Sequence, residues 1–343
     1  MKTITERFSW KVYALFSAAL IAAMLLCICV GSVNIPLKNT WTAMWNTLWG
    51  LELPQGVSKN IILNVRLPRV INVAMVGAAL SLCGAAMQGL LRNPLADGST
   101  LGVSSGASLG AVIALAFGVS VPGLAFAGTM IMAMLFAFLS LLLILSLAYV
   151  LDRSMSTNSI ILIGVIFSMF TSSAMNLIIT FAEDHAKSII FWTMGSLSGT
   201  NFSHSAILAL TLLVCASVLL RYSRELNAFA VGEDNARNIG VNVKKVKLVI
   251  LITVSVMIGV CVSIGGTISF VGLVMPHMTR MVVGPNHKRL LPSSMFSGAI
   301  FLLLADLVAR TLLSPIELSI GVVTSLVGAV AFIIIFYRTR KAG

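Results

Sequence analysis

Long stretches without an ionisable side chain dominate the hydropathy pattern of the chain, and short charged segments separate them. A membrane-spanning helix needs about 20 consecutive, mostly apolar residues. The stretch 70–91 provides one such helix, whereas 98–151 provides two, broken at Pro122-Gly123. The stretch 248–279 carries two glycines near its middle, and two crossings there require short helices. The pattern therefore predicts a bundle of membrane-spanning helices.

Lysine and arginine residues gather in clusters between the apolar stretches and orient the predicted helices. An excess of these residues marks the cytoplasmic loops of membrane proteins. If every cluster is cytoplasmic, each interval between clusters crosses the membrane and returns, so the chain has ten spans and both termini in the cytoplasm. The clusters are Lys2/Arg7/Lys11, Arg92, Arg153, 221–247, Arg280/Lys288/Arg289 and Arg338/Arg340/Lys341. The predicted spans are roughly 12–33, 68–91, 98–118, 124–150, 155–181, 201–220, 248–264, 268–283, 290–311 and 319–337.

Two segments admit a different interpretation. If 248–279 is a single tilted helix, the chain has eight spans, but Lys288 and Arg289 then lie outside. The uncharged run 12–37 could be taken for a signal peptide. It is longer than a signal core and has no convincing A-x-A cleavage site, so we expect it to be retained as the first span.

The composition excludes a soluble or disordered protein. Hydrophobic residues make up 58% of the chain and charged residues 10%, against about 25% charged residues in soluble domains. Disordered chains are poor in apolar residues, which excludes that class too. The formal net charge of +12 would suggest nucleic-acid binding in a soluble protein. Here it reflects membrane topology, and we expect lipid and no nucleic acid as a partner.

Small residues and cysteines inside the apolar stretches indicate packing rather than chemistry. Gly102, Gly106 and Gly110 have the spacing that lets helix backbones approach closely in lipid. The five cysteines, Cys27, Cys29, Cys83, Cys215 and Cys261, lie in apolar stretches, where a free thiol behaves as a small hydrophobe. We expect His277 to be a hydrogen-bonded structural residue, because a metal site needs three or four converging ligands.

The segment 221–247 is the only long, charge-rich internal loop. It predicts two short helices hinged at Gly232, with Glu233 and Asp234 where a helix N-terminus favours negative charge, and with Gly240 ending the second helix. Leu226, Phe229 and Ala230 form a small apolar face. The loop is either a solvated connector or a surface that docks into a soluble partner.

Several motifs in fixed order resemble one family of membrane proteins. The sequence is similar to the FecCD/cobalamin-permease family, the transmembrane subunits of type II ABC importers for iron–siderophores, haem and cobalamin. The motifs are Arg66-Leu-Pro-Arg69, Asn93-Pro-Leu-Ala-Asp97, Trp192-Thr-Met-Gly195, the run 265–280, Leu304-Ala-Asp-Leu-Val-Ala-Arg310 and Glu317-Leu-Ser-Ile-Gly321. The resemblance runs from about 66 to 336 and implies an all-α polytopic fold with ten transmembrane helices. Ser319 and Val330 replace prolines that are usual in the family, so the last span should be straighter.

The resemblance also implies partners. Two permease subunits, identical or different, form the pathway; a cytoplasmic ABC ATPase dimer docks below, and an extracytoplasmic substrate-binding protein docks outside. The residues that correspond to the ATPase contact are Leu226, Phe229, Gly232, Glu233, Arg237 and Gly240. The chain has no G-x-x-x-x-G-K-[ST] phosphate loop, so we expect no catalytic activity and no cofactor here, with ATP and Mg bound by the partner.

Three arginines correspond to positions that bind acidic residues of the binding protein in a cobalamin-importing relative. They are Arg66, Arg69 and Arg310. A guanidinium group suits a carboxylate because it binds both oxygens at once. The alternatives are anchoring in lipid headgroups and an internal pair, since Asp306 and Arg310 are four residues apart on one helix.

Four residues correspond to the cytoplasmic gate of the family. Asn93 and Leu95 follow the second span, and Thr157 and Asn158 begin the fifth. Small side chains suit a constriction that a bulky solute must pass. Each also has an ordinary explanation, because Asn93-Pro94 initiates turns and Thr157 could cap a helix.

The function expected from the resemblance is the permease subunit of an importer for an iron–siderophore complex in the bacterial cytoplasmic membrane. Haem or cobalamin import by the same family is the alternative. An ion-coupled secondary transporter or a membrane enzyme is more remote, because both use ionisable residues deep in several spans. Asp306, Arg310 and Glu317 all lie in one C-terminal stretch instead.

Overall fold

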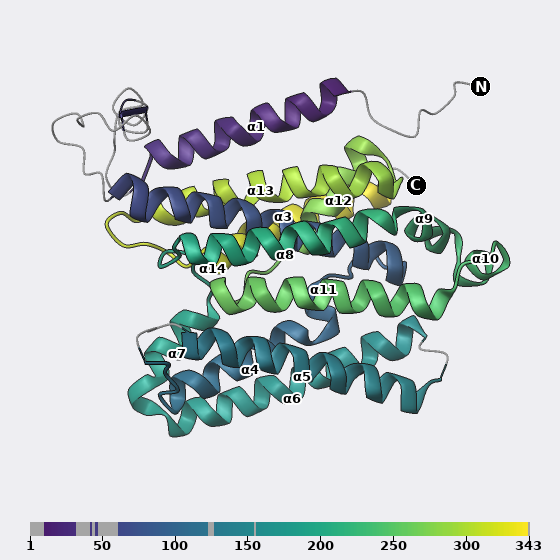
Figure 1. Cartoon of the computed structure of the whole chain (residues 1–343), viewed down its shortest axis with the longest axis horizontal. Coiled ribbons are helices and arrows are strands. Elements are labelled where there is room, and N and C mark those ends of the chain that lie inside the picture. The colour runs from purple at the N-terminus through teal and green to yellow at the C-terminus, as the bar shows by residue number, and fades with distance from the viewer. Residues whose placement is uncertain are drawn as a thin grey trace.

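Ten apolar helices run alongside one another in the computed structural model (Figure 1), which describes residues 10–31, 42, 45–46, 61–122, 127–153 and 156–341. Seven are long enough to cross a membrane: α1 (Trp10–Cys29), α3 (Leu67–Leu91, extended upstream by the helical turn Ile61–Arg66), α5 (Ala127–Leu151), α6 (Thr157–Phe181), α8 (Phe202–Arg221), α11 (Val243–Gly265) and α13 (His287–Thr311). Three have shorter apolar parts: α4 (Val103–Ala116), α12 (Val271–Val283) and α14 (Ile320–Lys341). Three further short helices, α7 (Ala186–Thr193), α9 (Ser223–Val231) and α10 (Glu233–Asn238), lie at the ends of the bundle.

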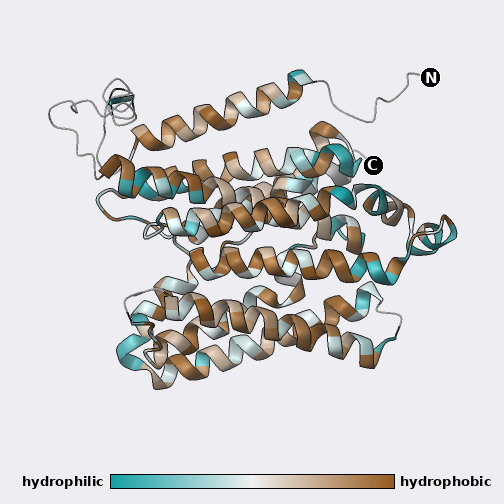
Figure 2. Cartoon of the chain, in the orientation of Figure 1, coloured by the Kyte–Doolittle hydropathy of each residue, from teal (hydrophilic) through white to brown (hydrophobic). Residues whose placement is uncertain are grey.

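Basic clusters distinguish the two ends of the bundle. In Figure 1, α1 begins, α14 ends and α9–α10 lie at the right-hand end, while α7 and the α13–α14 connection lie at the left. Figure 2 shows brown, apolar residues along the helices and teal, polar residues around α9 and α10. The right-hand end carries the basic clusters of 221–247 and is therefore the cytoplasmic end by the charge rule.

Polar side chains set where several helices begin. Ser156, Asn201, Asn242 and Asn286 precede α6, α8, α11 and α13, and each side chain accepts a hydrogen bond from a backbone N–H of the first turn. A capping side chain satisfies a donor that the helix itself leaves unpaired. The cap of α6 is thus Ser156, and Thr157 is the first residue of the helix.

The stretch 248–279 is divided between two helices. The chain turns between α11 and α12 through Gly266 and Phe270, which have φ values of +66° and +67°. The single-helix interpretation, and with it the eight-span topology, is therefore wrong. α11 also begins at Val243, upstream of the expected 248, because Asn242 caps it.

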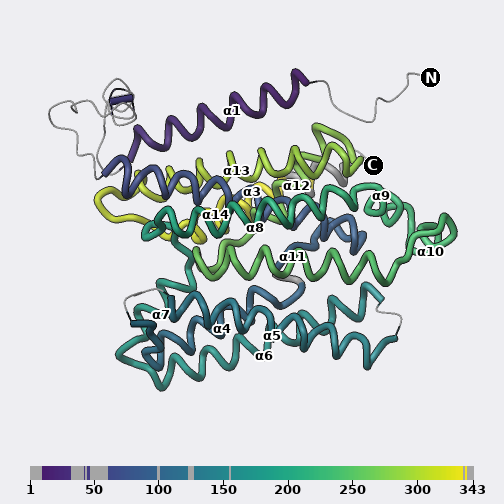
Figure 3. Tube along the Cα trace, viewed as in Figure 1, coloured from purple at the N-terminus to yellow at the C-terminus, as the bar shows by residue number. Residues whose placement is uncertain are grey.

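Helix α3 lies at the centre of the bundle and packs against α8, α11, α12 and α13 (Figure 3). A Cβ atom on Gly84 would collide with the backbone of Gly272, so α3 and α12 touch through glycine. In the same way Gly106 faces Ser140 and Gly110 faces Met132 across the α4–α5 contact. These two glycines pack helices within the subunit, as the spacing predicts, whereas Gly102 precedes α4 with a φ of +71°.

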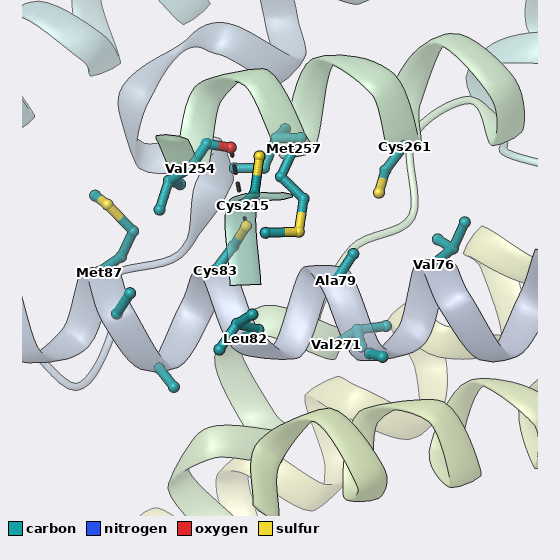
Figure 4. Packing of buried hydrophobic residues seen from close by; sticks show 14 of the residues in the cluster. Val76, Ala79, Leu82, Cys83, Met87, Cys215, Val254, Met257, Cys261 and Val271 are labelled. Carbon is teal, nitrogen blue, oxygen red and sulfur yellow. Dashed lines mark hydrogen bonds between the residues drawn. The ribbon is translucent and has the colours of Figure 1, made fainter. Parts of the chain in front are cut away.

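The interior is a continuous apolar core in which the cysteines are ordinary packing residues. Figure 4 shows Cys83 of α3, Cys215 of α8 and Cys261 of α11 among aliphatic and methionine side chains. All five cysteines are free and buried, which confirms the prediction. Cys83 donates from Sγ to the carbonyl of Val254 at 3.8 Å, a weak bond that fits the chemistry of a buried thiol.

Candidate functional site

The segment between α8 and α11 forms two short helices hinged at glycine, as predicted. Gly232 separates α9 from α10 with a φ of +144°, and Gly240 follows α10 with a φ of +89°. Both values lie where a side chain is disfavoured, so only glycine suits these two turns. The two helices project from the cytoplasmic end of the bundle (Figure 1).

The apolar face expected to be offered by α9 points into the subunit instead. Leu226 and Phe229 have no exposed surface and belong to the main core cluster, where α9 packs against α3 and α13. The interpretation of these two residues as a free docking face is therefore wrong, because the bundle itself covers them. They anchor the segment to the subunit.

Two other apolar residues of the segment face solvent. Val231 and Ile239 are 68% and 72% exposed, one just before the hinge and one just after α10. The exposed Arg237 lies close to them in sequence, and its guanidinium is 3.7 Å from the carboxylate of Asp234. Sequence reasoning missed Val231 and Ile239. A helix that packs on a bundle turns its apolar i and i+3 residues, here Leu226 and Phe229, toward the bundle. The same rule predicts that Val231, which lies off this face, is exposed.

Glu233 joins the segment to two membrane-spanning helices. Its Oε1 accepts a hydrogen bond of 3.0 Å from the hydroxyl of Thr157, the first residue of α6. The same oxygen is 2.6 Å from Nζ of Lys247 in α11, whose side chain is fully buried. A predicted coupling residue and a predicted gate residue therefore touch. Asn158, the next gate residue, is exposed.

The other predicted gate residues form the turn after α3. The side chain of Asn93 accepts a hydrogen bond of 2.9 Å from the N–H of Leu95, so the turn-initiating role of Asn93 is confirmed. Leu95 is 49% exposed. Arg92, just before the turn, has Nη1 3.9 Å from the position that a Cβ atom on Gly232 would occupy. The turn after α3, which carries the predicted gate residues, thus lies beside the hinge at Gly232.

The three predicted docking arginines come together at the opposite end of the bundle, but they are buried there. Arg66, Arg69 and Arg310 are 5%, 6% and 3% exposed. Arg66 donates to the carbonyls of Ile28 and Cys29, at 2.9 and 3.1 Å, and so holds the end of α1.

A carboxylate network holds the other two arginines. Arg69 donates to Oδ1 of Asp306 at 3.0 and 3.1 Å and to Oε2 of Glu317 at 2.8 Å. Arg310 lies 3.0 Å from Oδ2 of Asp306 and donates to the carbonyl of Cys27 at 3.0 Å. The internal Asp306–Arg310 pair is therefore confirmed. The network ties together α1, α3, α13 and the residues before α14.

A cavity of about 370 Å³ lies between α3, α4, α6, α11 and the α11–α12 connection. Its wall is rich in hydroxyl groups, and no basic side chain is among the described residues that line it. Ser105 of α4 donates to Ser168 of α6 across it at 3.1 Å. The polar residues of the wall are Asp97, Ser104, Ser105, Ser108, Ser168, Ser172, Thr193, Thr267 and Ser269. Sequence reasoning missed this cavity because its wall comes from segments far apart in the chain.

The surface of α6 carries polar groups beside this cavity. Ser172 and Asn176, one turn apart, are both exposed. Polar side chains in a membrane-spanning helix usually face protein or water rather than lipid. Within the described residues no three possible metal ligands lie together. His277 differs from expectation in that its buried Nδ1 has no hydrogen-bond partner among the residues that the structure describes.

Comparison with known proteins decides the family. The model of the FecCD transport family matches residues 19–338. The chain belongs to this family. An uncharacterised ABC transporter permease of Bacillus subtilis is 40% identical over 97% of this chain and 95% of its own length. The hemin transport system permease of Yersinia pestis is 35% identical over 93% and 94%.

Solved structures agree. A metal-chelate type ABC transporter in an inward-facing conformation has a TM-score of 0.82 and 33% identity, with 96% of this chain and 100% of that chain covered. Other FecCD relatives are named for molybdate, iron(3+)-hydroxamate and vitamin B12 import. The chain is thus an ABC importer permease, a multi-pass transport subunit of the cytoplasmic membrane with seven helices long enough to span it and three shorter apolar helices. Family membership implies ATPase and binding-protein partners.

Proposed function

We propose that this FecCD permease carries an iron–siderophore complex into the cytoplasm, driven by ATP hydrolysis on a partner ATPase dimer. The observation that supports this substrate is the hydroxyl-lined cavity. Serine and threonine hydroxyls both donate and accept hydrogen bonds, so they suit a polar chelate rich in amide, hydroxamate or hydroxyl oxygens. The absence of basic side chains among the described lining residues disfavours the carboxylates of haem and an oxyanion such as molybdate.

The position of the cavity supports a role in the pathway. Asp97 at one end directly follows the gate turn, and Thr193 and Thr267 lie at the outer end near α7. The exposed polar groups of α6 continue its wall onto the surface. In the proposed assembly this face of α6 meets a second permease subunit across a water-filled passage, with the inner gate at Asn93, Leu95, Thr157 and Asn158.

The proposed ATPase contact is the projecting α9–α10 segment. Gly232, Glu233, Arg237 and Gly240 keep the role that the sequence indicates, and Val231 and Ile239 replace Leu226 and Phe229 as its apolar part. An exposed apolar pair beside a charged residue is typical of a surface that a partner covers.

The binding protein is proposed to dock at the opposite end, over the cluster of Arg66, Arg69 and Arg310. The side chain of Glu317, which binds Arg69 in this cluster, is 35% exposed. An acidic residue of the partner would compete with Glu317 for Arg69.

Uptake by a reconstituted transporter tests the substrate. The permease, its ATPase and its binding protein are placed in liposomes, and ATP-dependent entry of a neutral ferric hydroxamate, hemin and cobalamin is compared. We expect the ferric hydroxamate to enter and hemin not to. Uptake of hemin or cobalamin alone would overturn the siderophore assignment, and uptake driven by a proton gradient without ATP would overturn the importer mechanism.

A further inference from the structure

Lys247 is an unusual residue for its position. It lies in the second turn of α11, its side chain has no exposed surface, and its ammonium group is 2.6 Å from Oε1 of Glu233. Lysine is almost never fully buried unless it is paired, because removing the charge from water is costly. The sequence pattern places Lys247 among the solvated basic residues of the loop, so the burial is a tertiary feature.

Helix α10 has few other ties to the rest of the subunit. It is six residues long, and glycines lie on both sides of it. Its Asp234–Arg237 pair is local and exposed, and Asn235 donates to the nearby carbonyl of Val231. Among the described contacts, the long-range polar bonds of α10 both converge on Glu233: one to Lys247 of α11 and one to Thr157 of α6.

We propose that Lys247 is the positioning residue that makes a rigid link of the coupling segment and the start of α6. This inference rests on the proposed function. With Lys247 in place, a strong, charge-assisted bond to its ammonium group holds Glu233 in one orientation. The same carboxylate oxygen accepts a hydrogen bond from the hydroxyl of Thr157. A displacement of α10 then moves the first residue of α6, which is the predicted gate. Without Lys247, the two glycine hinges let α10 move while α6 stays in place.

The hinge residues explain why one charge pair is sufficient for this link. Gly232 and Gly240 let α10 rotate as a unit, so its position is set by the side chains that hold it. Ala236 is buried and contributes packing, but its methyl side chain cannot form a hydrogen bond, and its backbone bonds are local, to Gly232 and Val241. Glu233 is therefore the point at which force on the segment reaches the membrane-spanning helices.

Four variants test the link in the complete transporter reconstituted with its ATPase and binding protein. Lys247→Met removes the charge and keeps much of the length, Lys247→Arg keeps the charge, and Glu233→Gln/Lys247→Met removes both charges. Lys244→Met is the matched control, since it makes the same substitution at an exposed lysine of the same helix, α11, outside the α9–α10 segment. The readouts are ATP hydrolysis, substrate uptake and their ratio.

We expect Lys247→Met to lower uptake per ATP about tenfold, within the range of about 5- to 150-fold typical of coupling between sites, while the ATPase rate persists. Lys247→Arg should restore the ratio, and Lys244→Met should match the wild type. The double variant should have the Tm of the wild type, because no buried charge is left unpaired. Its uptake per ATP should nevertheless stay as low as that of Lys247→Met. A folded Lys247→Met protein with the wild-type ratio would overturn the proposal.

A distance measurement makes the result independent of transport. All five native cysteines are buried, so spin labels can be placed at cysteines introduced for the exposed residues Asn158 and Asn235. We expect a narrow distance distribution in the wild type and a broad one in Lys247→Met. If the two distributions are the same, the link is refuted. If the wild type shows no ATP-driven uptake although its distribution is narrow, the proposed function fails and the link survives.

Discussion

Removal of Asp306 should destabilise the outer end of the permease far more than removal of Glu317. The side chain of Asp306 is 1% exposed and pairs with both Arg69 and Arg310. The side chain of Glu317 is 35% exposed and, among the described residues, pairs only with Arg69. Asp306→Asn leaves two buried guanidinium groups without their shared carboxylate. Glu317→Gln leaves Arg69 with Asp306. The two variants make the same chemical change in one cluster, so they control for each other.

The magnitudes follow from burial. Breaking a buried ion pair by removing one partner costs about 3–5 kcal/mol, because the other charge remains in a low-dielectric environment. A partly exposed pair contributes about 0–1 kcal/mol. Each kcal/mol shifts the Tm of a domain of 150–250 residues by about 2–4 °C. We therefore expect Asp306→Asn to lower the Tm by roughly 6–20 °C and Glu317→Gln to lower it by about 4 °C at most.

The assay is thermal unfolding of the purified permease, followed by the fluorescence of its five tryptophans. Where unfolding is irreversible, the half-life at a fixed temperature gives the same ranking. The reasoning is refuted if Asp306→Asn is as stable as Glu317→Gln. Glu317→Gln also tests docking. If Arg69 receives an acidic residue of the binding protein, loss of its competitor raises the affinity, and an unchanged affinity refutes that role.

Three further predictions concern packing, the cavity and the ATPase contact. Gly84→Val should destabilise the protein by about 1–3 kcal/mol or more through overpacking of α3 on α12. Gly199→Ala, whose Cβ atom would meet no atom within 4 Å, should leave the Tm unchanged. Ser172→Cys should react with a membrane-impermeant thiol reagent that leaves the wild type unlabelled, since the native cysteines are buried; protection from the reagent would place this residue outside the pathway. Val231→Glu or Ile239→Glu should weaken co-purification of the ATPase without lowering the Tm, because both native side chains are exposed. A normal yield of co-purified ATPase would exclude these residues from the contact.

Much of the fold follows from local properties of the sequence. Uncharged stretches of sufficient length become helices in a membrane because the backbone must bond within each segment. The basic clusters orient them. The two short helices α9 and α10 were predictable for a similarly local reason, since Gly232 and Gly240 adopt backbone angles that other residues avoid. The family followed from short motifs whose order along the chain is itself sequence information.

Tertiary structure decided which of these residues meet. Arg69 and Asp306 are 237 positions apart, and Thr157 and Glu233 are 76 apart, so hydropathy alone cannot pair them. Leu226 and Phe229 look like a docking face in a short amphipathic helix, and only the bundle beneath α9 shows that they are already covered. Lys247 looks like a solvated basic residue until α10 brings Glu233 to it. Periodicity fixes which side chains share a face of a helix, whereas the packing of distant helices determines what that face touches.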